Sequence, residues 1–391
     1  MNDRIVYAKI IFAIALCAST TVAVMHGFLS VVDAKSGGVF SRTTLARDAL
    51  TQIINEPNDL VIFYGSSMTR AGFSPRKFDK DLKEKGKNIK SFNFGFGGLN
   101  PYFQDFLSRR IKDEFQQQDR KLKLAMIEFN PFQTTKTRWN RAVPVVDSFL
   151  SMLANDSELL EIAKQDITRG ILLFNIKYLR DNLSSEIITS SVGREIFPPY
   201  QWEQFKDSEE TKNARREISN KVNKLFEEDY PDLNYQDWMY TWQGAGTIPE
   251  ERSEKTLKAF DVYYPLIQTD AQMKNDRLSR IRSADIEELH FEPLLVESFI
   301  QTVKNFQQFS NHVEVIMLPR NTKWISNTPE GKKRLVAAIQ QIEKATGVKI
   351  RDHQNLDIIN PSMFRDTTHL ARYRGDVIYT DFLVEQYQDS L

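Results

Sequence analysis

The sequence is short of cysteine and has no surplus of charge, and each shortage excludes a class of protein. Cys17 is the only cysteine, which excludes an internal disulfide framework and a cysteine-rich metal site. Lysine and arginine together number 52, as do aspartate and glutamate, so the chain lacks the overall basic footprint that favours nucleic-acid binding. Its 391 residues leave room for one large domain or two modest ones.

One long apolar run lies near the N-terminus. Between Ile10 and Val32, His26 is the only basic or acidic side chain, and Lys9 and Asp33 bound the run. A helix of this length spans about 30 Å of hydrocarbon, whereas a cleaved signal peptide has a shorter apolar region and a small-residue cleavage site. We therefore expect residues 1–33 to be an uncleaved, single-pass signal anchor in the cell membrane. Basic residues flank it on both sides, so charge bias leaves the topology open, and export of the rest is the expectation.

Two blocks of alternating strands and helices follow, separated by a long insertion. We read residues 34–58 as a tether, 59–135 and 286–391 as the two parts of one α/β domain, and 136–285 as the insertion. Strands and helices alternate along these two blocks, and a polar or glycine-rich loop follows each strand. This pattern predicts a doubly wound parallel sheet. We expect strands at 60–64, 89–94, 122–129, 312–318 and 348–351, and helices at 78–85, 102–115, 291–309 and 332–346, with a last one through Leu383.

The insertion reads as amphipathic helices with an aromatic-rich segment between them. We expect helices at 145–153, 159–169 and 209–228. Trp238 and Trp242 belong to the aromatic segment and are candidate substrate-binding residues that could stack on sugar rings. Packing of the insertion onto the core is the simpler interpretation, and we favour it.

The first predicted strand ends in Gly65, Ser66 and Ser67. Gly65 lets the backbone turn sharply, so the two serines lie at the carboxyl end of the strand, where open α/β sheets bind ligands. By themselves the serines give only a weak signal, because most serines in this setting are N-caps or turn formers.

Among the five histidines, His369 stands out because Asp366 precedes it by three residues in a loop that enters the last helix. That spacing lets the carboxylate meet the imidazole Nδ1–H and leaves Nε2 free to accept a serine proton. A capping aspartate beside a surface histidine is the alternative for this pair considered alone.

Taken together, these blocks resemble the SGNH (GDSL-like) hydrolase superfamily, which has a flavodoxin-like three-layer α/β fold. The matching stretches are 65–67, 93–98, 128–130 and 366–369. The resemblance implies that Ser67 is the nucleophile, that His369 and Asp366 complete a catalytic triad, and that an oxyanion hole is formed by Ser67, Gly98 and Asn130. The chain departs from the family in two places: Ser66 stands where the family has aspartate, and proline follows Asn130.

The anchor and the C-terminal Asp-x-x-His are similar to membrane-anchored members that work in teichoic-acid D-alanylation and alginate-type O-acetylation. This resemblance implies an exported serine O-acyltransferase or esterase that handles an acyl group of a cell-envelope glycopolymer without a cofactor or metal. It also implies a membrane-bound O-acyltransferase as partner. The alternative is a catalytically inactive glycan-binding or scaffold subunit of a polysaccharide modification complex. The acyl group, the acceptor and the oligomeric state stay open.

Overall fold

The computed structural model describes residues 3–31, 50–97, 100–140, 150, 153–179, 208–229 and 249–391. The chain forms two compact units. One comprises Met1–Ser41 and Pro144–Gln201, and the other comprises Arg42–Val143 and Trp202–Leu391. The insertion predicted at 136–285 is therefore divided, because its later part belongs to the same unit as the sheet.

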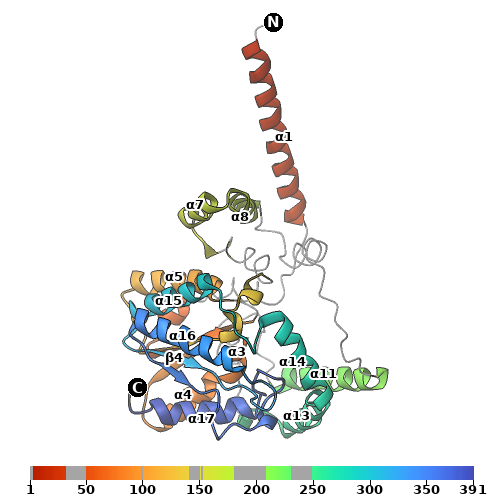
Figure 1. The fold of residues 1–391 in the computed structure, drawn as a ribbon, viewed down its shortest axis with the longest axis vertical. Coiled ribbons are helices and arrows are strands. Elements are labelled where there is room, and N and C mark those ends of the chain that lie inside the picture. Colours follow the sequence, from red (N-terminus) through yellow and green to blue (C-terminus); the bar gives the residue numbers. More distant parts are fainter. Residues whose placement is uncertain are drawn as a thin grey trace. The chain divides into compact units, whose positions relative to one another are not determined.

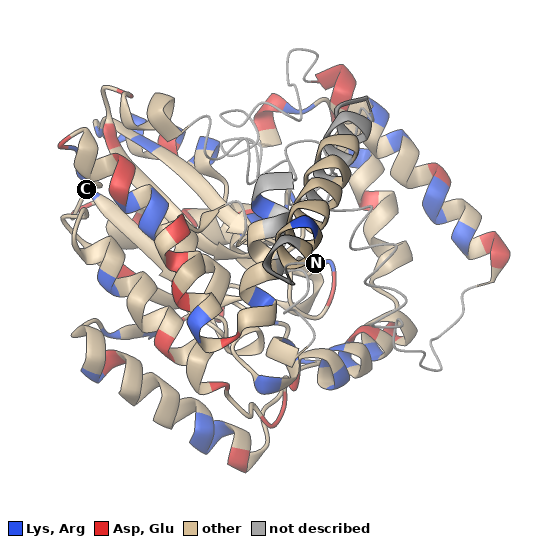
Figure 2. Ribbon diagram, turned by 90° about the horizontal axis from the view of Figure 1, so that it is seen from above, with Lys and Arg blue, Asp and Glu red and all other residues tan. Residues whose placement is uncertain are grey.

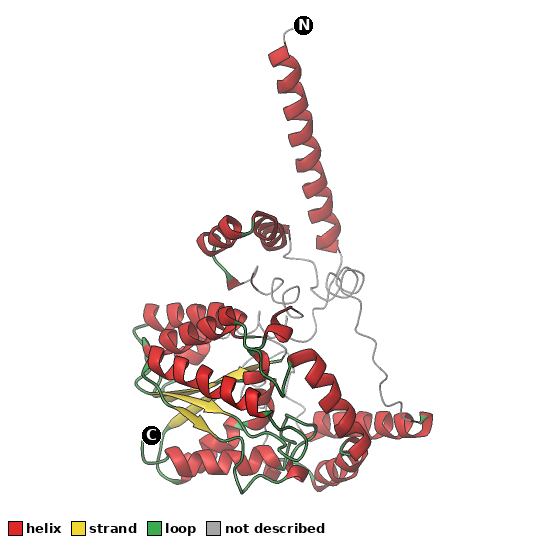
Figure 3. Cartoon of the chain, in the orientation of Figure 1, coloured by secondary structure: helices red, strands yellow, loops and turns green. Residues whose placement is uncertain are grey.

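A parallel five-stranded sheet forms the centre of the larger unit, as the alternation of strands and helices predicts. The strands lie in the order β2-β1-β3-β4-β5, and every pairing between neighbours is parallel (Figure 3). Their side chains are mostly buried, as expected for strands covered on both faces. The strands are β1 (Asp59–Ser66), β2 (Ile89–Phe96), β3 (Leu124–Glu128), β4 (Val313–Met317) and β5 (Ile350–Asp352).

Helices cover both faces of this sheet and complete three layers (Figure 1). One face carries α5 (Pro101–Gln117), α15 (Pro293–Gln307) and α16 (Pro329–Thr346), and the other carries α4 (Pro75–Glu84) and α17 (Gly375–Tyr387). All but α17 begin with a proline in the first turn, where a missing N–H costs nothing. Charged residues of both signs lie along the helices (Figure 2).

The strand order fixes where a ligand site is expected. The chain passes from β1 to β2 on one side and places β3 on the other side of β1, so the connections diverge between β1 and β3. In open α/β sheets of this order, ligands bind beyond the carboxyl ends of the strands at that divergence. Ser66 ends β1 and Glu128 ends β3, which brings two of the predicted blocks to this point.

The described part of the insertion is helical. It contains α7 (Asp156–Gln165), α8 (Ile167–Leu179), α11 (Glu209–Asp229), α13 (Glu254–Ile267) and α14 (Asp270–Ala284). The prediction of one helix at 159–169 was wrong because the helix breaks at Asp166. The backbone of Asp166 is extended, and α8 begins at the next residue, Ile167. Asp166 Oδ1 accepts the backbone N–H of Arg169 in the first turn of α8. Most of the helix predicted at 145–153 lies outside the described residues.

The structure differs from the sequence prediction in two places near the N-terminus. Helix α1 (Asp3–Val31) covers the predicted anchor. Across the residues that the structure describes, no helix combines the length and the apolar character needed to cross a membrane. The second difference is in the predicted tether, because Ile53 and Ile54 are fully buried in the larger unit. Arg120 holds this segment by donating hydrogen bonds to the backbone oxygens of Ile54, Glu56 and Asn58.

Candidate active site

Ser67 is the first residue of the short helix α3 (Ser67–Gly72), which begins directly where β1 ends. Ser66 is the N-cap, and its Oγ accepts the backbone N–H of Met68 at 3.1 Å. The two adjacent serines therefore have different roles. Ser66 is buried and ties the turn together, while Ser67 is partly exposed.

The structure brings together the three residues predicted as a triad. Ser67 Oγ lies 2.8 Å from His369 Nε2, and His369 Nδ1 lies 2.8 Å from Asp366 Oδ2 and 3.0 Å from Oδ1. Ser67 and His369 are 302 residues apart in the chain, so this contact comes from the fold and not from local sequence. These distances are those of a nucleophile, a base and a residue that orients the base.

The carboxylate of Asp366 is held by several donors. Its Oδ1 accepts the backbone N–H groups of Thr368 at 2.9 Å and His369 at 2.8 Å, and Arg280 and Arg365 each lie at 3.4 Å. Burial alone would raise the pKa of Asp366, but His369, Arg280 and Arg365 lower it well below its usual range. Asp366 therefore stays ionised and can stabilise a protonated imidazole.

Helix α14 supports the triad, and the sequence analysis did not anticipate this. Arg280 lies on α14, where burial would lower its pKa and the charges of Asp366 and Asp276 raise it. Asp276 accepts Arg280 Nε at 2.8 Å and also binds the backbone N–H and the hydroxyl of Thr367, inside the Asp-x-x-His loop. The i, i+4 spacing of Asp276 and Arg280 indicates an ion pair, but nothing in the sequence indicates that it faces the triad.

Glu128 is a second residue that the sequence analysis did not assign. It ends β3, is 5 % exposed, and its two carboxylate oxygens accept hydrogen bonds from Ser66 and Thr69. The donors are the backbone N–H groups at 2.7 and 3.2 Å and the hydroxyls at 2.7 and 2.5 Å. Because Ser67 lies between these two residues in the chain, Glu128 fixes the backbone on both sides of Ser67.

Gly65 is required at its position for a packing reason. A Cβ on Gly65 would overlap the Thr69 hydroxyl and the Glu128 carboxylate. The absence of a side chain therefore lets the carboxylate approach the turn. The prediction of a sharp turn at Gly65 was wrong, because Gly65 lies within β1 and the chain leaves the strand only after Ser66.

Asn130 lies where the third predicted block places it, at the carboxyl end of β3. Its Nδ2 donates to Ser66 Oγ at 3.0 Å and lies 3.5 Å from Met68 Sδ, and its Oδ1 accepts the N–H of Phe132. The side-chain amide is therefore directed towards the residues that flank Ser67. Its role as an oxyanion donor stays a prediction.

The second predicted block also lies beside Ser67. Asn93 is fully buried, donates to the carbonyls of Thr69 and Phe73, and so holds α3 against β2. At Gly97 a Cβ would lie 3.9 Å from the Cβ of Ser67, so this loop passes directly beside Ser67. Gly98, the predicted N–H donor, lies outside the described residues.

The two tryptophans that the sequence suggests as substrate-binding residues fall in a part of the chain that the structure does not describe. Trp238 and Trp242 lie outside the described residues, so their predicted role is not examined by the structure. Within the described segments, no group of three or more His, Cys, Asp or Glu side chains could hold a metal ion.

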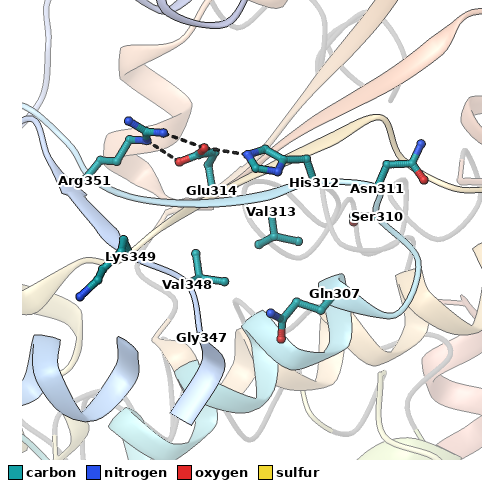
Figure 4. A pocket seen from close by; sticks show the side chains of 10 residues that line it. All are labelled: Gln307, Ser310, Asn311, His312, Val313, Glu314, Gly347, Val348, Lys349 and Arg351. Carbon is teal, nitrogen blue, oxygen red and sulfur yellow. Dashed lines mark hydrogen bonds and ion pairs between the residues drawn. The ribbon is translucent and has the colours of Figure 1, made fainter. Parts of the chain in front are cut away.

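One pocket of the structure lies away from Ser67 and has a different character from the site around Ser67. It has a volume of about 580 Å³ and lies at the amino ends of β4 and β5, opposite the end that carries Ser67 (Figure 4). Glu314 accepts a hydrogen bond from Arg351 Nε at 2.5 Å and contacts His312 Nε2 at 2.8 Å. Because Glu314 and Arg351 already bind one another, we place the candidate active site at the carboxyl end of the sheet, beside Ser67.

A second pocket of about 280 Å³ opens beside Ser67. It lies between α3, α11, α13 and the loop that carries His369, all of which belong to the larger unit. A nucleophile with its base and an adjoining pocket are the elements of a site for acyl transfer. In comparisons with known proteins, no protein-family model and no curated protein matches the chain.

Proposed function

We propose that the protein is a serine esterase or O-acyltransferase of the SGNH hydrolase type. The observation that carries this proposal is the continuous hydrogen-bonded series from Ser67 Oγ to His369 Nε2 and from His369 Nδ1 to Asp366. A binding protein or scaffold has no need for a serine, a histidine and an ionised carboxylate in this arrangement. The fold adds support, because the series lies at the carboxyl ends of β1 and β3, where the connections diverge.

In the proposed first step, Ser67 Oγ attacks the carbonyl carbon of an ester. The new C–O bond forms as the hydroxyl proton moves to His369 Nε2, and Asp366 stabilises the resulting imidazolium. Cleavage of the C–O bond to the leaving alcohol then expels an alkoxide that takes the proton from His369. The product is an acyl-enzyme at Ser67 and a free alcohol.

The negative charge that develops on the carbonyl oxygen needs hydrogen-bond donors. We assign this role to the backbone N–H groups of Ser67 and Gly98 and to the side-chain amide of Asn130. One N–H of that amide binds Ser66 and the other is directed at the sulfur of Met68, a weak acceptor that an oxyanion would displace. Loss of one such donor costs about 10²-fold or more in rate.

In the second step, a water molecule or a hydroxyl of an acceptor attacks the acyl-enzyme. His369 removes a proton from the attacking oxygen and returns it to Ser67 when the acyl C–O bond breaks. With water the reaction is hydrolysis, and with a sugar hydroxyl it is acyl transfer. The proposed setting is the cell envelope, with a glycopolymer as substrate or acceptor and a membrane-bound O-acyltransferase as partner.

The proposal is tested by hydrolysis of 4-nitrophenyl acetate by the full chain. We expect turnover that falls on the order of 10⁴-fold in Ser67→Ala and His369→Ala. His290→Ala is a matched control, because His290 Nδ1 also lies 2.8 Å from an aspartate, Asp285, but is not bonded to Ser67. Turnover that survives both triad substitutions would refute the assignment, and a folded wild-type chain without turnover would favour the scaffold alternative.

A further inference from the structure

Two walls of the pocket beside Ser67 come from the predicted insertion and not from the α/β core. They are α11 and α13, which pack together through Val222, Leu225 and Ala259. The remaining walls are α3, which begins with Ser67, and the loop that carries His369. A ligand in this pocket therefore lies between Ser67 and the two insertion helices.

Helix α13 is tied to the loop that carries His369. Gln268 Nε2 donates to the backbone oxygen of Phe364 at 2.6 Å. The Tyr264 hydroxyl donates to the backbone oxygen of Arg372 at 2.8 Å. The two bonds reach the chain before and after His369, so they hold the wall that α13 forms at a fixed place beside the histidine. The pocket is therefore formed in the free protein, as ligand sites usually are.

Both helices present aromatic rings to the pocket. The rings are those of Phe226 on α11 and of Phe260, Tyr263 and Tyr264 on α13. Phe260 and Tyr264 stack on each other, whereas Tyr263 packs against the α11–α13 core and is partly exposed. The face of an aromatic ring carries partial negative charge, so it attracts the C–H groups on the flat side of a sugar ring.

Two uncharged polar side chains line the same pocket one helical turn apart on α11. They are Ser219 and Asn223. In the part of the chain that the structure describes, no hydrogen bond joins either side chain to another group, and Asn223 is exposed. An amide both donates and accepts hydrogen bonds, and a hydroxyl does the same, so these groups match the hydroxyls of a sugar.

The arginines of the pocket do not decide the charge of its ligand. Arg365 contacts Asp366, and Arg372 acts on the buried Asp376. We therefore argue from the rings and the uncharged polar groups alone, and these fit a ring that carries hydroxyls.

We propose that α11 and α13 bind a sugar ring in the alcohol portion of the ester. In this arrangement the ring of Tyr263 contacts the flat face of the sugar, and Ser219 and Asn223 bind its hydroxyls. The proposal rests on the proposed function, because this sugar carries the ester that Ser67 attacks. It makes Tyr263 and Asn223 residues that determine specificity.

The test compares acetate esters whose alcohol portions differ in ring and in hydroxyls. The probes are the methyl 6-O-acetyl glycosides of glucose, galactose and mannose. The references are 1-O-acetylglycerol, which has hydroxyls without a ring, and cyclohexylmethyl acetate, which has a ring without hydroxyls. We expect kcat/KM of the full chain for at least one sugar ester to exceed that for both references by about tenfold or more. A reference ester hydrolysed as efficiently as the best sugar ester would overturn the proposal.

The residues are tested with Tyr263→Leu, which keeps an apolar side chain but removes the flat ring, and with Asn223→Ala. Each should lower the ratio of kcat/KM for the preferred sugar ester over 1-O-acetylglycerol by about threefold or more. Asn220→Ala is the matched control, because Asn220 is an exposed asparagine on the same helix that does not line the pocket. An unchanged ratio in both pocket variants, or an equal fall in Asn220→Ala, would overturn the proposal.

A binding measurement separates this inference from the proposed function. Saturation-transfer NMR of the full chain with the methyl glycosides of glucose, galactose and mannose, and with glycerol as reference, requires no turnover. If no ester is hydrolysed, the proposed function fails, while glycoside binding that is weakened in Tyr263→Leu and Asn223→Ala still supports the sugar site. Hydrolysis without any preference for a sugar, or glycoside binding that is unchanged in both variants, leaves the esterase standing and refutes the sugar site.

Discussion

Glu128 at the end of β3 accepts both the backbone N–H and the hydroxyl of Ser66 at 2.7 Å. The family that the sequence resembles has an aspartate at the position of Ser66. In this chain a carboxylate reaches the same turn from the neighbouring strand, and Gly65 leaves the space for it. Ser66, the residue before Ser67, therefore has no carboxylate of its own but is bonded to the carboxylate of Glu128.

Glu128→Gln should damage both stability and catalysis. The two oxygens of Glu128 both accept hydrogen bonds, but the glutamine side chain has one oxygen and one NH2 group. If the NH2 group replaces the oxygen that faces Ser66 Oγ, it finds no free lone pair there, because Ser66 Oγ already accepts from Met68 and Asn130. We expect a loss of about 1–3 kcal/mol in the free energy of unfolding. We also expect kcat to fall about tenfold to a hundredfold as Ser67 loses its position.

The control for this variant is Glu314→Gln. Glu314 is also a buried carboxylate on the sheet, opposite Met126 of β3, but its partners Arg351 and His312 lie at the amino end. Denaturant unfolding and ester turnover are measured on both variants. A similar loss of stability with no selective loss of kcat in Glu128→Gln would contradict a positioning role.

Gly65→Ala should lower both stability and turnover, because Gly65 leaves the space that the Glu128 carboxylate occupies. The added methyl would overlap Glu128 and Thr69, and overpacking of this kind costs about 1–3 kcal/mol. Gly72→Ala is the comparison, because its Cβ would lie 3.4 Å from Leu370, an ordinary contact. Thermal unfolding and turnover of the two variants test the prediction, and equal behaviour would show that the turn adjusts freely.

Arg280→Gln should lower stability in a pH-dependent way. The pKa of Asp366 is held well below its usual range, so this carboxylate contributes stability above about pH 4 that is lost as the pH falls towards its folded pKa. Without Arg280 the pKa of Asp366 rises towards its usual value and less stability is lost on acidification. The wild type should therefore exceed the variant at pH 7, and the difference should narrow below about pH 4. A difference independent of pH would argue against charge as the cause.

Substitution of Asp376 should change the free energy of unfolding with the opposite pH dependence. Burial raises its pKa to about 7, although Arg372 and backbone N–H groups of Val377, Arg374 and Tyr373 act to lower it. The protonated form is favoured in the folded state, so the stability it contributes is present below about pH 4 and is lost as the pH rises through 7. Asp376→Asn removes this titration, and its stability relative to wild type should therefore increase between pH 4 and 8. Parallel stability curves for the two proteins would contradict this.

The sheet and the pairing of Asp366 with His369 were accessible from the sequence because both rest on local patterns, whereas Ser67 was assigned through the resemblance of the four blocks to a known family. Apolar runs that end in glycine or asparagine indicate buried parallel strands, and the spacing of Asp366 and His369 indicates a local hydrogen bond. Strand ends were placed within about two residues, as local patterns allow. The break at Asp166 was missed because the apolar period continues across a residue whose side chain starts a new helix.

The supporting residues could not be predicted because their partners are distant in sequence. Glu128 is 62 residues from Ser66, and Arg280 meets Asp366 only through the packing of α14. A charge at the end of an apolar strand and an i, i+4 ion pair on a helix both read as ordinary surface features. Tertiary packing turns both into supports of one site.

The most direct test of the central claim is the site of modification by a fluorophosphonate. The reagent is incubated with the folded full chain, and the labelled peptide is identified by mass spectrometry. Our account predicts one phosphonyl adduct on Ser67, absent in Ser67→Ala and strongly reduced in His369→Ala, with Ser66 unmodified. An adduct on another residue, or no adduct on a folded wild-type chain, would contradict it.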